Sequence, residues 1–183
     1  MGLPVLDAIS SLYDLDTERF SANLNEAVEA WSSTDKGSAL EDVARILISS
    51  VRLFTYRDQN LMTVDSGELD LTYTVVPALD FEDWGKLLLV ECKNWNSRVT
   101  MKEVLAFGMK LIITRAKVGL LVTQLGVTGS HEAHAQNAID RIYDVTSTLI
   151  LVLTFDDLRS IAAGASFYEL LRLKEYELRV RRR

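Results

Sequence analysis

The sequence predicts an α/β protein in which a mixed β-sheet is flanked by helices. Apolar residues at three-to-four spacing predict helices, and short alternating or uniformly apolar runs predict strands. The expected order is helix, three strands, helix, strand, helix, strand and further helices. The first three strands can form a meander, and the later strands return through helical crossovers. We therefore expect an α-β-β-β-α-β core preceded by an N-terminal helical extension.

Size and composition exclude several classes of protein. The chain has 183 residues, of which 48% are hydrophobic and 25% charged, the balance of a globular protein with its own core. No apolar stretch approaches the roughly 18 residues of a membrane span, so no membrane association is expected. Cys92 is the single cysteine, which excludes a disulfide framework and a cysteine-rich zinc site. Together with the lack of a signal-peptide pattern, this predicts a cytoplasmic protein.

The N-terminal segment differs from the rest of the chain in charge. Residues 1–35 hold seven acids and one base, whereas residues 36–183 hold nineteen of each. Apolar spacing predicts two short helices at 4–13 and 16–32, and the run 32–37 has the composition of a linker. We therefore expect an acidic helical extension over 1–35 and one domain over 36–183.

The domain begins with the strongest helix signal of the chain, from Ser38 to Phe54. Ser38 and Glu41 match a capping box, in which the Glu41 carboxylate reaches back to the backbone N–H of Ser38. A turn is expected at 57–60. The remaining expected elements are strands at 61–65, 68–76 and 86–92, a helix at 100–115, a strand at 118–123, a helix at 130–143, a strand at 148–154, and helices at 155–162 and 166–180.

Two acids and a lysine stand where two of these strands come together. Asp70 interrupts the alternating strand 68–76, and Glu91 and Lys93 follow the apolar run 87–90. Positions two apart on a strand point to the same face, so the Glu91 and Lys93 side chains project together. If the two strands pair, Asp70 and Glu91 converge on one hard cation of the kind that Mg²⁺ represents. Lys93 could then position or deprotonate a water and offset charge on a phosphate. This combination favours metal-assisted phosphodiester hydrolysis.

These residues resemble the restriction-endonuclease-like, or PD-(D/E)xK, superfamily. Within this superfamily, the sequence over about residues 38–140 is similar to the catalytic domain of Mrr-like, type IV restriction endonucleases. The stretches that carry the likeness are Gly67-Glu-Leu-Asp-Leu71, Leu88-Leu-Val-Glu-Cys-Lys-Asn-Trp95 and Gly119-Leu-Leu-Val-Thr123. Two positions depart from the pattern: Leu69 replaces the proline of the motif, and Glu91 stands where many Mrr-like domains have glutamine.

The resemblance implies a mixed sheet flanked by helices and Mg²⁺-dependent cleavage of nucleic acid, with Mn²⁺ able to substitute. Asp70 and Glu91 are implied as metal ligands, and the main-chain carbonyl of Cys92 as a third. Glu41 is implied to reach the metal directly or through water, and Lys93 to serve the attacking water. A homodimer is also implied, because such enzymes often cut both strands as dimers.

Each of these residues also has a purely structural interpretation. Glu91 and Lys93 could form a surface ion pair worth only about 0–1 kcal/mol. Asp70 could face solvent on a half-buried strand, and the capping box alone would explain Glu41. Cys92 is expected to be a buried apolar filler whose side chain points away from Glu91 and Lys93.

Charge is compatible with a nucleic-acid partner. The net charge of −6 lies entirely in residues 1–35, and residues 91–120 carry a local charge of +4. Asn94, Arg98 and Lys102 follow the proposed catalytic strand and are the candidates for contact with the nucleic-acid backbone. Alternatively, these basic residues belong to a helix face that is exposed to solvent and binds no partner.

The sequence thus predicts a metal-dependent endonuclease acting on DNA, with RNA left open, as the effector of a restriction or antiviral defence system. A recognition domain is not evident, so a further domain or subunit is compatible with this function. Two alternatives stay open: a junction-resolving or repair nuclease, and a non-catalytic binding or assembly module that retains the fold.

Overall fold

A computed structural model describes residues 12–30, 32–63, 67–129 and 134–180. In this part of the chain, a five-stranded mixed sheet follows the strand order β1-β2-β3-β4-β5. The first three strands are antiparallel to one another, and β3, β4 and β5 are parallel. The strands are β1 (Phe54–Thr63), β2 (Gly67–Val75), β3 (Leu87–Lys93), β4 (Val118–Thr123) and β5 (Leu149–Thr154).

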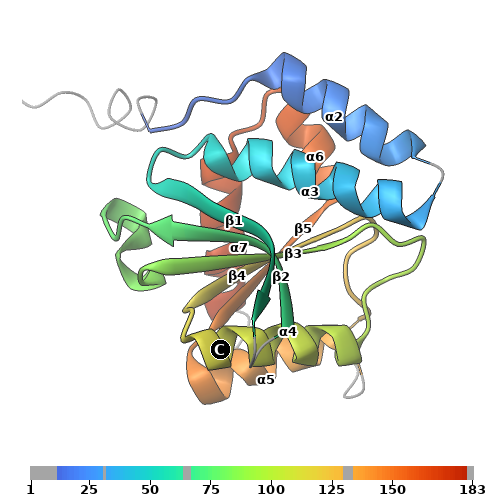
Figure 1. Ribbon diagram of the computed structural model, residues 1–183. Helices are drawn as coiled ribbons and strands as arrows, with labels where there is room; N and C mark the ends of the chain where they lie inside the picture. Colours follow the sequence, from blue (N-terminus) through green and yellow to red (C-terminus); the bar gives the residue numbers. More distant parts are fainter. Residues whose placement is uncertain (1–11, 31, 64–66, 130–133, 181–183) are drawn as a thin grey trace, which may run out of the picture.

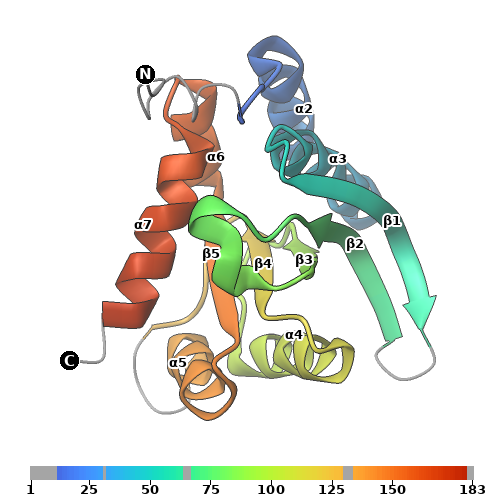
Figure 2. The same ribbon diagram turned by 90° about the vertical axis from the view of Figure 1, so that its left-hand side faces the viewer.

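Helices cover both faces of the sheet (Figures 1 and 2). On one face α3 (Ser33–Ser49) lies across β1, β2 and β3, and α2 (Thr17–Glu29) packs on the outside of α3. The helix α6 (Phe155–Ala162) lies on the same side and contacts α2. On the other face α4 (Met101–Thr114) packs against α5 (Ala135–Thr146). The last helix, α7 (Phe167–Val180), runs along the edge of the sheet beside β5, from the level of α6 to that of α5. The predicted α/β class with a mixed, helix-flanked sheet is confirmed.

Burial explains why these segments form these elements. The odd positions Leu69, Leu71 and Tyr73 of β2 are buried in the core, and α4 buries Val104, Phe107 and Leu111 at helical spacing. Each large apolar side chain so buried contributes about 1.5–3 kcal/mol relative to an exposed one. β4 is buried at every position because helices cover both of its faces, as its uniformly apolar sequence indicates.

A close approach between α4 and β4 depends on Gly119. A Cβ atom at this position would come within 2.6 Å of the Phe107 ring and 2.8 Å of the Leu111 side chain. The absence of a side chain therefore lets α4 lie directly on β4, at the position where Gly119 is paired with Leu89 of β3.

The start of the domain is where the sequence-based expectations are wrong. The expected linker 32–37 is the first part of α3, whose cap is Ser32, since its hydroxyl oxygen accepts a hydrogen bond from the backbone N–H of Asp35 at 3.0 Å. The capping box between Ser38 and Glu41 is also wrong, because both residues lie inside this helix.

The next segment differs from the expectation as well. Phe54 begins β1 instead of ending the helix, and the expected turn 57–60 is strand. The β1–β2 register shifts between Tyr56 and Asp58, and Asn60 has a φ of 53°. The bulge allows the polar residues 57–60, whose composition predicts a turn, to lie within the strand. An element missed by the sequence analysis is the 3₁₀ segment Leu79–Trp84, whose buried Phe81 and Trp84 pack on Phe54.

The acidic N-terminal segment packs on the rest of the structure. Phe20, Leu24 and Ala27 of α2 belong to the same buried cluster as the residues of α3 and the sheet. The expected boundary after residue 35 falls within α3. Most of the expected helix 4–13 lies outside the described residues. None of the helices in the described part of the chain combines the length and apolar character that crossing a bilayer requires.

Candidate active site

The strands β2 and β3 separate at one end of the sheet and form a fork. Their ladder ends at the pair Leu71–Val90, although β2 extends back to Gly67 and β3 continues to Lys93. At the fork the Asp70 carboxylate accepts a hydrogen bond from the backbone N–H of Cys92, with 2.7 Å between Oδ2 and N. The acid therefore satisfies the backbone donor of a residue that lies beyond the end of the β2–β3 ladder.

Asp70 and Glu91 lie on the same face of the sheet. Thr72 of β2 is paired with Leu89 of β3, and the side chains of such a pair point to the same face of the sheet. Asp70 and Glu91 lie two residues further along their strands, toward the fork, so their side chains point to that face as well. This face is the one covered by α4, because Glu91 forms an ion pair with Lys110 of that helix. The structure thus brings the two acids together as the sequence predicts. Both are buried, with exposed fractions of 9% for Asp70 and 7% for Glu91, so Asp70 does not face solvent.

Glu91 is held between two ammonium groups. Lys93 Nζ lies 2.8 Å from Glu91 Oε1, and Lys110 Nζ lies 2.7 Å from Glu91 Oε2. The Lys93 and Lys110 side chains are only 22% and 17% exposed. This buried triad differs from the solvent-exposed ion pair that the structural interpretation of Glu91 and Lys93 assumed. Removing one member of such a group leaves a buried charge without compensation, which is costly.

The ionisation of the site follows from burial and from these neighbours. Burial raises the pKa of Asp70, and the nearby Glu91 carboxylate raises it further, to about 6; the Cys92 N–H, Lys93 and Lys110 partly oppose this rise. Burial lowers the pKa of Lys93, but the charge and hydrogen bond of Glu91 outweigh this effect and raise it overall. Lys93 therefore stays an ammonium at neutral pH, which favours stabilisation of phosphate charge over proton abstraction.

Cys92 points to the opposite face, as expected for the residue between Glu91 and Lys93. Burial raises the pKa of its thiol well above the ordinary value, and the Asp70, Glu41 and Glu91 carboxylates raise it further. The thiol is thus a protonated, buried group at neutral pH. Its role here is that of a core residue, and its main-chain carbonyl remains the predicted third metal ligand.

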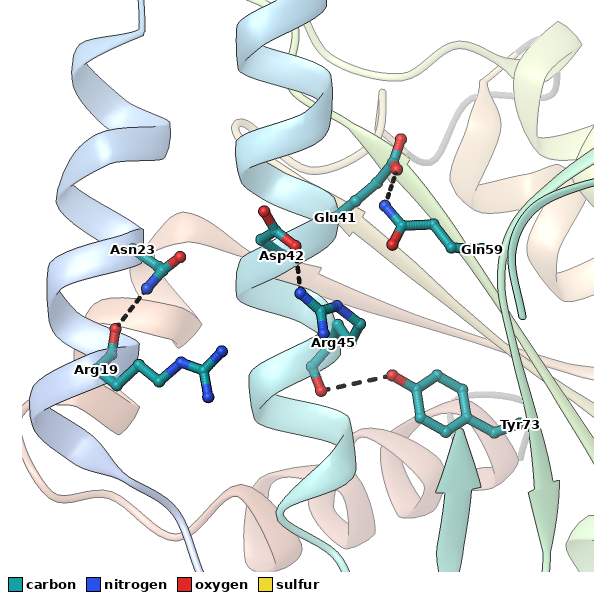
Figure 3. A network of polar contacts seen from close by, with 7 residues as sticks. All are labelled: Arg19, Asn23, Glu41, Asp42, Arg45, Gln59 and Tyr73. Atoms are coloured by element: carbon teal, nitrogen blue, oxygen red, sulfur yellow. Dashed lines mark hydrogen bonds and ion pairs between the residues drawn. The ribbon is translucent and has the colours of Figure 1, made fainter. Parts of the chain in front are cut away.

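Glu41 approaches the fork from the other side of the sheet. It lies on α3, and its Oε2 accepts a hydrogen bond from Gln59 Nε2 of β1 at 2.8 Å (Figure 3). The α3 face carries Tyr73, whose hydroxyl donates to the Arg45 carbonyl, whereas Asp70 and Glu91 point toward α4. The hydrogen bond that the described residues give the Glu41 carboxylate is thus with Gln59, and its approach to a cation, directly or through water, stays a prediction. Its described link to the site is the electrostatic effect on the Cys92 thiol.

The three residues expected to contact nucleic acid have different surroundings. Asn94 is buried, and its Nδ2 donates to the carbonyls of Ala27 and Lys36 at 3.0 and 2.9 Å. Its amide therefore ties the end of β3 to α2 and α3, which corrects its assignment as a backbone contact. Arg98 and Lys102 are exposed, and Arg98 Nη1 donates to the Val127 carbonyl at 3.2 Å. Both remain available on the surface beyond the fork.

Folding divides the basic stretch 91–120 into two groups. Lys93 and Lys110 are engaged with Glu91, and Arg98 and Lys102 lie near the fork. Arg115 and Lys117 precede β4, at the end of the sheet away from the fork. The positive charge near Glu91 is therefore smaller than the local charge of +4 that residues 91–120 carry together.

Two contacts near the fork could not be read from the sequence, one made by Lys110 and one by Trp95. Lys110 was counted only as part of the basic stretch, because periodicity does not show which strand end a helical residue reaches. The exposed ring of Trp95 lies beside the ammonium group of Lys93, with 5.5 Å from Nζ to the ring centroid. The ring shields one side of this ammonium and adds a cation–π contact.

The donor set fits a hard divalent cation of the Mg²⁺ type. Asp70 and Glu91 supply carboxylate oxygens, and Mg²⁺ is commonly held by one or two carboxylates together with waters and substrate phosphate. Within residues 12–30, 32–63, 67–129 and 134–180, no group of three or more histidine, cysteine, aspartate or glutamate side chains could hold a metal. Two carboxylates, completed by waters and a substrate phosphate, are a donor set that suits Mg²⁺.

A cavity lies next to the fork. It is a cavity of about 540 Å³ at the carboxyl ends of β4 and β5, lined by Arg98, Gln124, Gln136, Arg159 and Lys174 among others. Gln124 connects it to the fork, because its backbone N–H donates to the Lys93 carbonyl. Arg98 therefore faces this cavity at the same edge of the sheet as Lys93.

Comparison of the chain with family models, with curated proteins and with solved structures finds no match.

Proposed function

We propose that this protein is a metal-dependent nuclease that hydrolyses phosphodiester bonds, with DNA as the substrate. The observation that carries the proposal is the shared face of Asp70 and Glu91 at the β2–β3 fork, with two lysine ammonium groups within hydrogen-bond distance of Glu91. The element order α3-β1-β2-β3-α4-β4 is that of the α-β-β-β-α-β core expected from the resemblance to PD-(D/E)xK enzymes.

The side chains of the fork have distinct roles in this proposal. Asp70 and Glu91 hold the cation, with the Cys92 carbonyl as the third protein ligand. A divalent cation bound there supplies Lewis-acid activation of the phosphate and of the attacking water. The Lys93 ammonium stabilises the negative charge that develops on the phosphate in the transition state. Glu41 is not assigned as a ligand, because its described hydrogen bond is with Gln59.

The preference for nucleic acid rests on the surface around the fork. Arg98 and Lys102 are exposed beyond β3, and Trp95 presents a partly exposed ring beside Lys93. Cations near a phosphodiester and an aromatic ring able to stack on a base are suited to a nucleic-acid chain. Restriction or antiviral defence remains the proposed setting, together with a homodimer, a separate recognition domain or subunit, and a cytoplasmic location.

A non-catalytic module is the second candidate, and one observation favours it. Both carboxylate oxygens of Glu91 are already paired with lysines, an arrangement that also serves as a structural ion-pair triad. A module of this kind would bind nucleic acid or protein without hydrolysis and without need of a divalent cation. The two candidates therefore differ in their dependence on metal.

A cleavage assay separates these candidates. Supercoiled plasmid, four-way junction DNA and single-stranded RNA are each incubated with the protein in Mg²⁺, Mn²⁺ or EDTA. The proposal predicts cutting of DNA that needs metal and is lost in Asp70→Asn and Glu91→Gln, but not in Glu82→Gln, an exposed acid at the other end of the sheet. Preference for the junction would indicate the resolvase or repair alternative. Cutting in EDTA, or cutting by both site variants, would reject the mechanism.

A further inference from the structure

The ion pair between Lys110 and Glu91 sets a condition on how a cation reaches the fork. Lys110 Nζ and Lys93 Nζ lie 2.7 and 2.8 Å from the two oxygens of Glu91. A divalent cation shared by Asp70 and Glu91 needs at least one of these oxygens, and it would lie close to two positive charges. In low dielectric surroundings such repulsion is strong. One ammonium must therefore leave Glu91 before the cation is held tightly.

Lys110 is the ammonium that is better placed to leave. Lys93 is on the same strand as Glu91, two residues away and on the same face, so its side chain begins beside the carboxylate. Lys110 reaches Glu91 from a separate element, α4, at the end of a flexible four-carbon chain. The two side chains are similarly exposed, 17% for Lys110 and 22% for Lys93, so the difference between them lies in the elements that carry them and not in their access to solvent.

A nucleic-acid phosphate offers Lys110 an alternative partner. An incoming phosphodiester carries a negative charge and accepts hydrogen bonds from ammonium groups. When Lys110 transfers to the phosphate, Glu91 Oε2 becomes available to the cation and one positive charge is neutralised. Binding of the phosphate and binding of the cation then favour each other, and linkage requires the effect to be reciprocal.

We infer that Lys110 is an electrostatic latch that keeps Glu91 from binding a divalent cation until a phosphodiester backbone arrives and takes up its ammonium group. This inference rests on the proposed metal site and adds its regulation: the cation and the nucleic acid bind cooperatively, through Lys110. Lys110 acts as a positioning residue through Glu91, and it contacts the substrate only in the open state of the latch.

The test measures Mn²⁺ affinity by isothermal titration calorimetry, without activity as a readout. Wild type, Lys110→Met, Lys110→Arg and the control Lys117→Met are titrated alone and with a phosphorothioate duplex, whose backbone keeps its charge and resists hydrolysis. Lys117 is exposed and lies before β4, so its variant removes one charge away from the fork.

In wild type the duplex should tighten Mn²⁺ binding about fivefold or more, the lower end of ordinary coupling between sites. Without the duplex, Lys110→Met should bind Mn²⁺ about fivefold more tightly than wild type. Addition of the duplex should then tighten Mn²⁺ binding by this variant less than it does for wild type. Lys110→Arg and Lys117→Met should behave like wild type. Unchanged or weaker Mn²⁺ binding by Lys110→Met would overturn the latch.

The outcome also separates failure of the latch from failure of the proposed function. Tight Mn²⁺ binding by wild type that Lys110→Met does not alter rejects the latch and leaves the nuclease proposal standing. Absence of Mn²⁺ binding in wild type and in every variant, with and without the duplex, rejects both.

A measurement on wild type covers the case in which Lys110→Met does not fold. In protein labelled with ¹⁵N-lysine, the Nζ resonance of Lys110 should move when the duplex and Mg²⁺ are added together, and much less with Mg²⁺ alone. Lys110→Arg assigns this resonance, because it removes the signal and keeps the charge. A Lys110 resonance that stays in place with both added would contradict the latch.

Discussion

The carboxylate of Asp70 accepts a hydrogen bond from the backbone N–H of Cys92, and this contact spans 2.7 Å across the β2–β3 fork. The Asp70 side chain therefore accepts the hydrogen bond that a backbone carbonyl accepts elsewhere in a β-ladder, at the point where the β2–β3 ladder ends. The same contact holds Asp70 beside the residue that follows Glu91. Two acids are thus kept close in a buried setting, where the Lys93 and Lys110 ammonium groups offset part of their repulsion.

The raised pKa of Asp70 predicts an unusual dependence of stability on pH. The carboxyl has a pKa of about 6 in the folded protein and about 3.9 when unfolded. Between these values the folded state binds the proton more tightly, so the contribution of Asp70 to stability falls as pH rises from about 4 to 6. Asp70→Asn, which keeps an acceptor for Cys92, should therefore stabilise the protein at pH 7 by up to about 3 kcal/mol, and hardly at pH 4. Urea unfolding in EDTA measures this, and a difference that grows toward acid pH would contradict it.

Lys93 should act through its charge. Its pKa is raised in the folded protein, because the effect of Glu91 outweighs that of burial, so it remains an ammonium over the range in which nucleases are assayed. Lys93→Met should lower the rate of DNA cleavage by about 10²-fold or more, the usual effect of losing one charge-stabilising group. Lys93→Arg should recover part of this loss. Single-turnover cleavage with saturating protein provides the measurement, and equal activity of Lys93→Met and wild type would rule out this role.

Asn94 should prove a structural residue. Its amide donates to the carbonyls of Ala27 and Lys36, and removal leaves these buried acceptors without that donor. Asn94→Ala should lower the free energy of unfolding by about 1–3 kcal/mol. At a temperature where the variant is folded, its affinity for duplex DNA should match that of wild type. A selective loss of DNA affinity without loss of stability would restore Asn94 as a contact residue.

Gly119 should be needed for the position of α4. A Cβ atom there would meet Phe107 and Leu111 at 2.6 and 2.8 Å, so Gly119→Ala must displace α4 or its side chains. The expected loss of stability is about 1–3 kcal/mol, as for other overpacked cores. Because α4 carries Lys110, the variant should also disturb the Lys110–Glu91 pair, which the Nζ resonance of Lys110 reports. Gly37→Ala is the matched control, since a Cβ there meets nothing within 4 Å.

Much of the sheet could be predicted because its strands are strongly patterned. The alternation around Asp70 and the apolar run before Glu91 each point to one structure, and the observed strands β2, β3 and β4 follow them closely. The candidate acids were recognisable for the same reason, because a charged side chain in such a strand is rarely there for packing.

The rest depended on tertiary contacts that local pattern does not contain. Ser32–Gly37 has the composition of a linker but is helical, since Ser32 caps α3 and α2 packs along it. Asn94 is held by α2 and α3, which are distant in sequence, and Lys110 of α4 pairs with Glu91 of β3, so neither contact could be read from spacing. Glu41 is placed near the metal by resemblance alone; its helix α3 lies on the face of the sheet opposite α4, and its reach to a cation stays a prediction.

The most direct measurement is a crystal structure of the protein grown or soaked with Mn²⁺ and a phosphorothioate duplex, with anomalous diffraction data. The account predicts one anomalous peak at the fork, bound by carboxylate oxygens of both Asp70 and Glu91 at about 2.0–2.3 Å, with Lys110 moved away from Glu91. Glu91 still paired with both lysines and no anomalous peak between the two acids would contradict it.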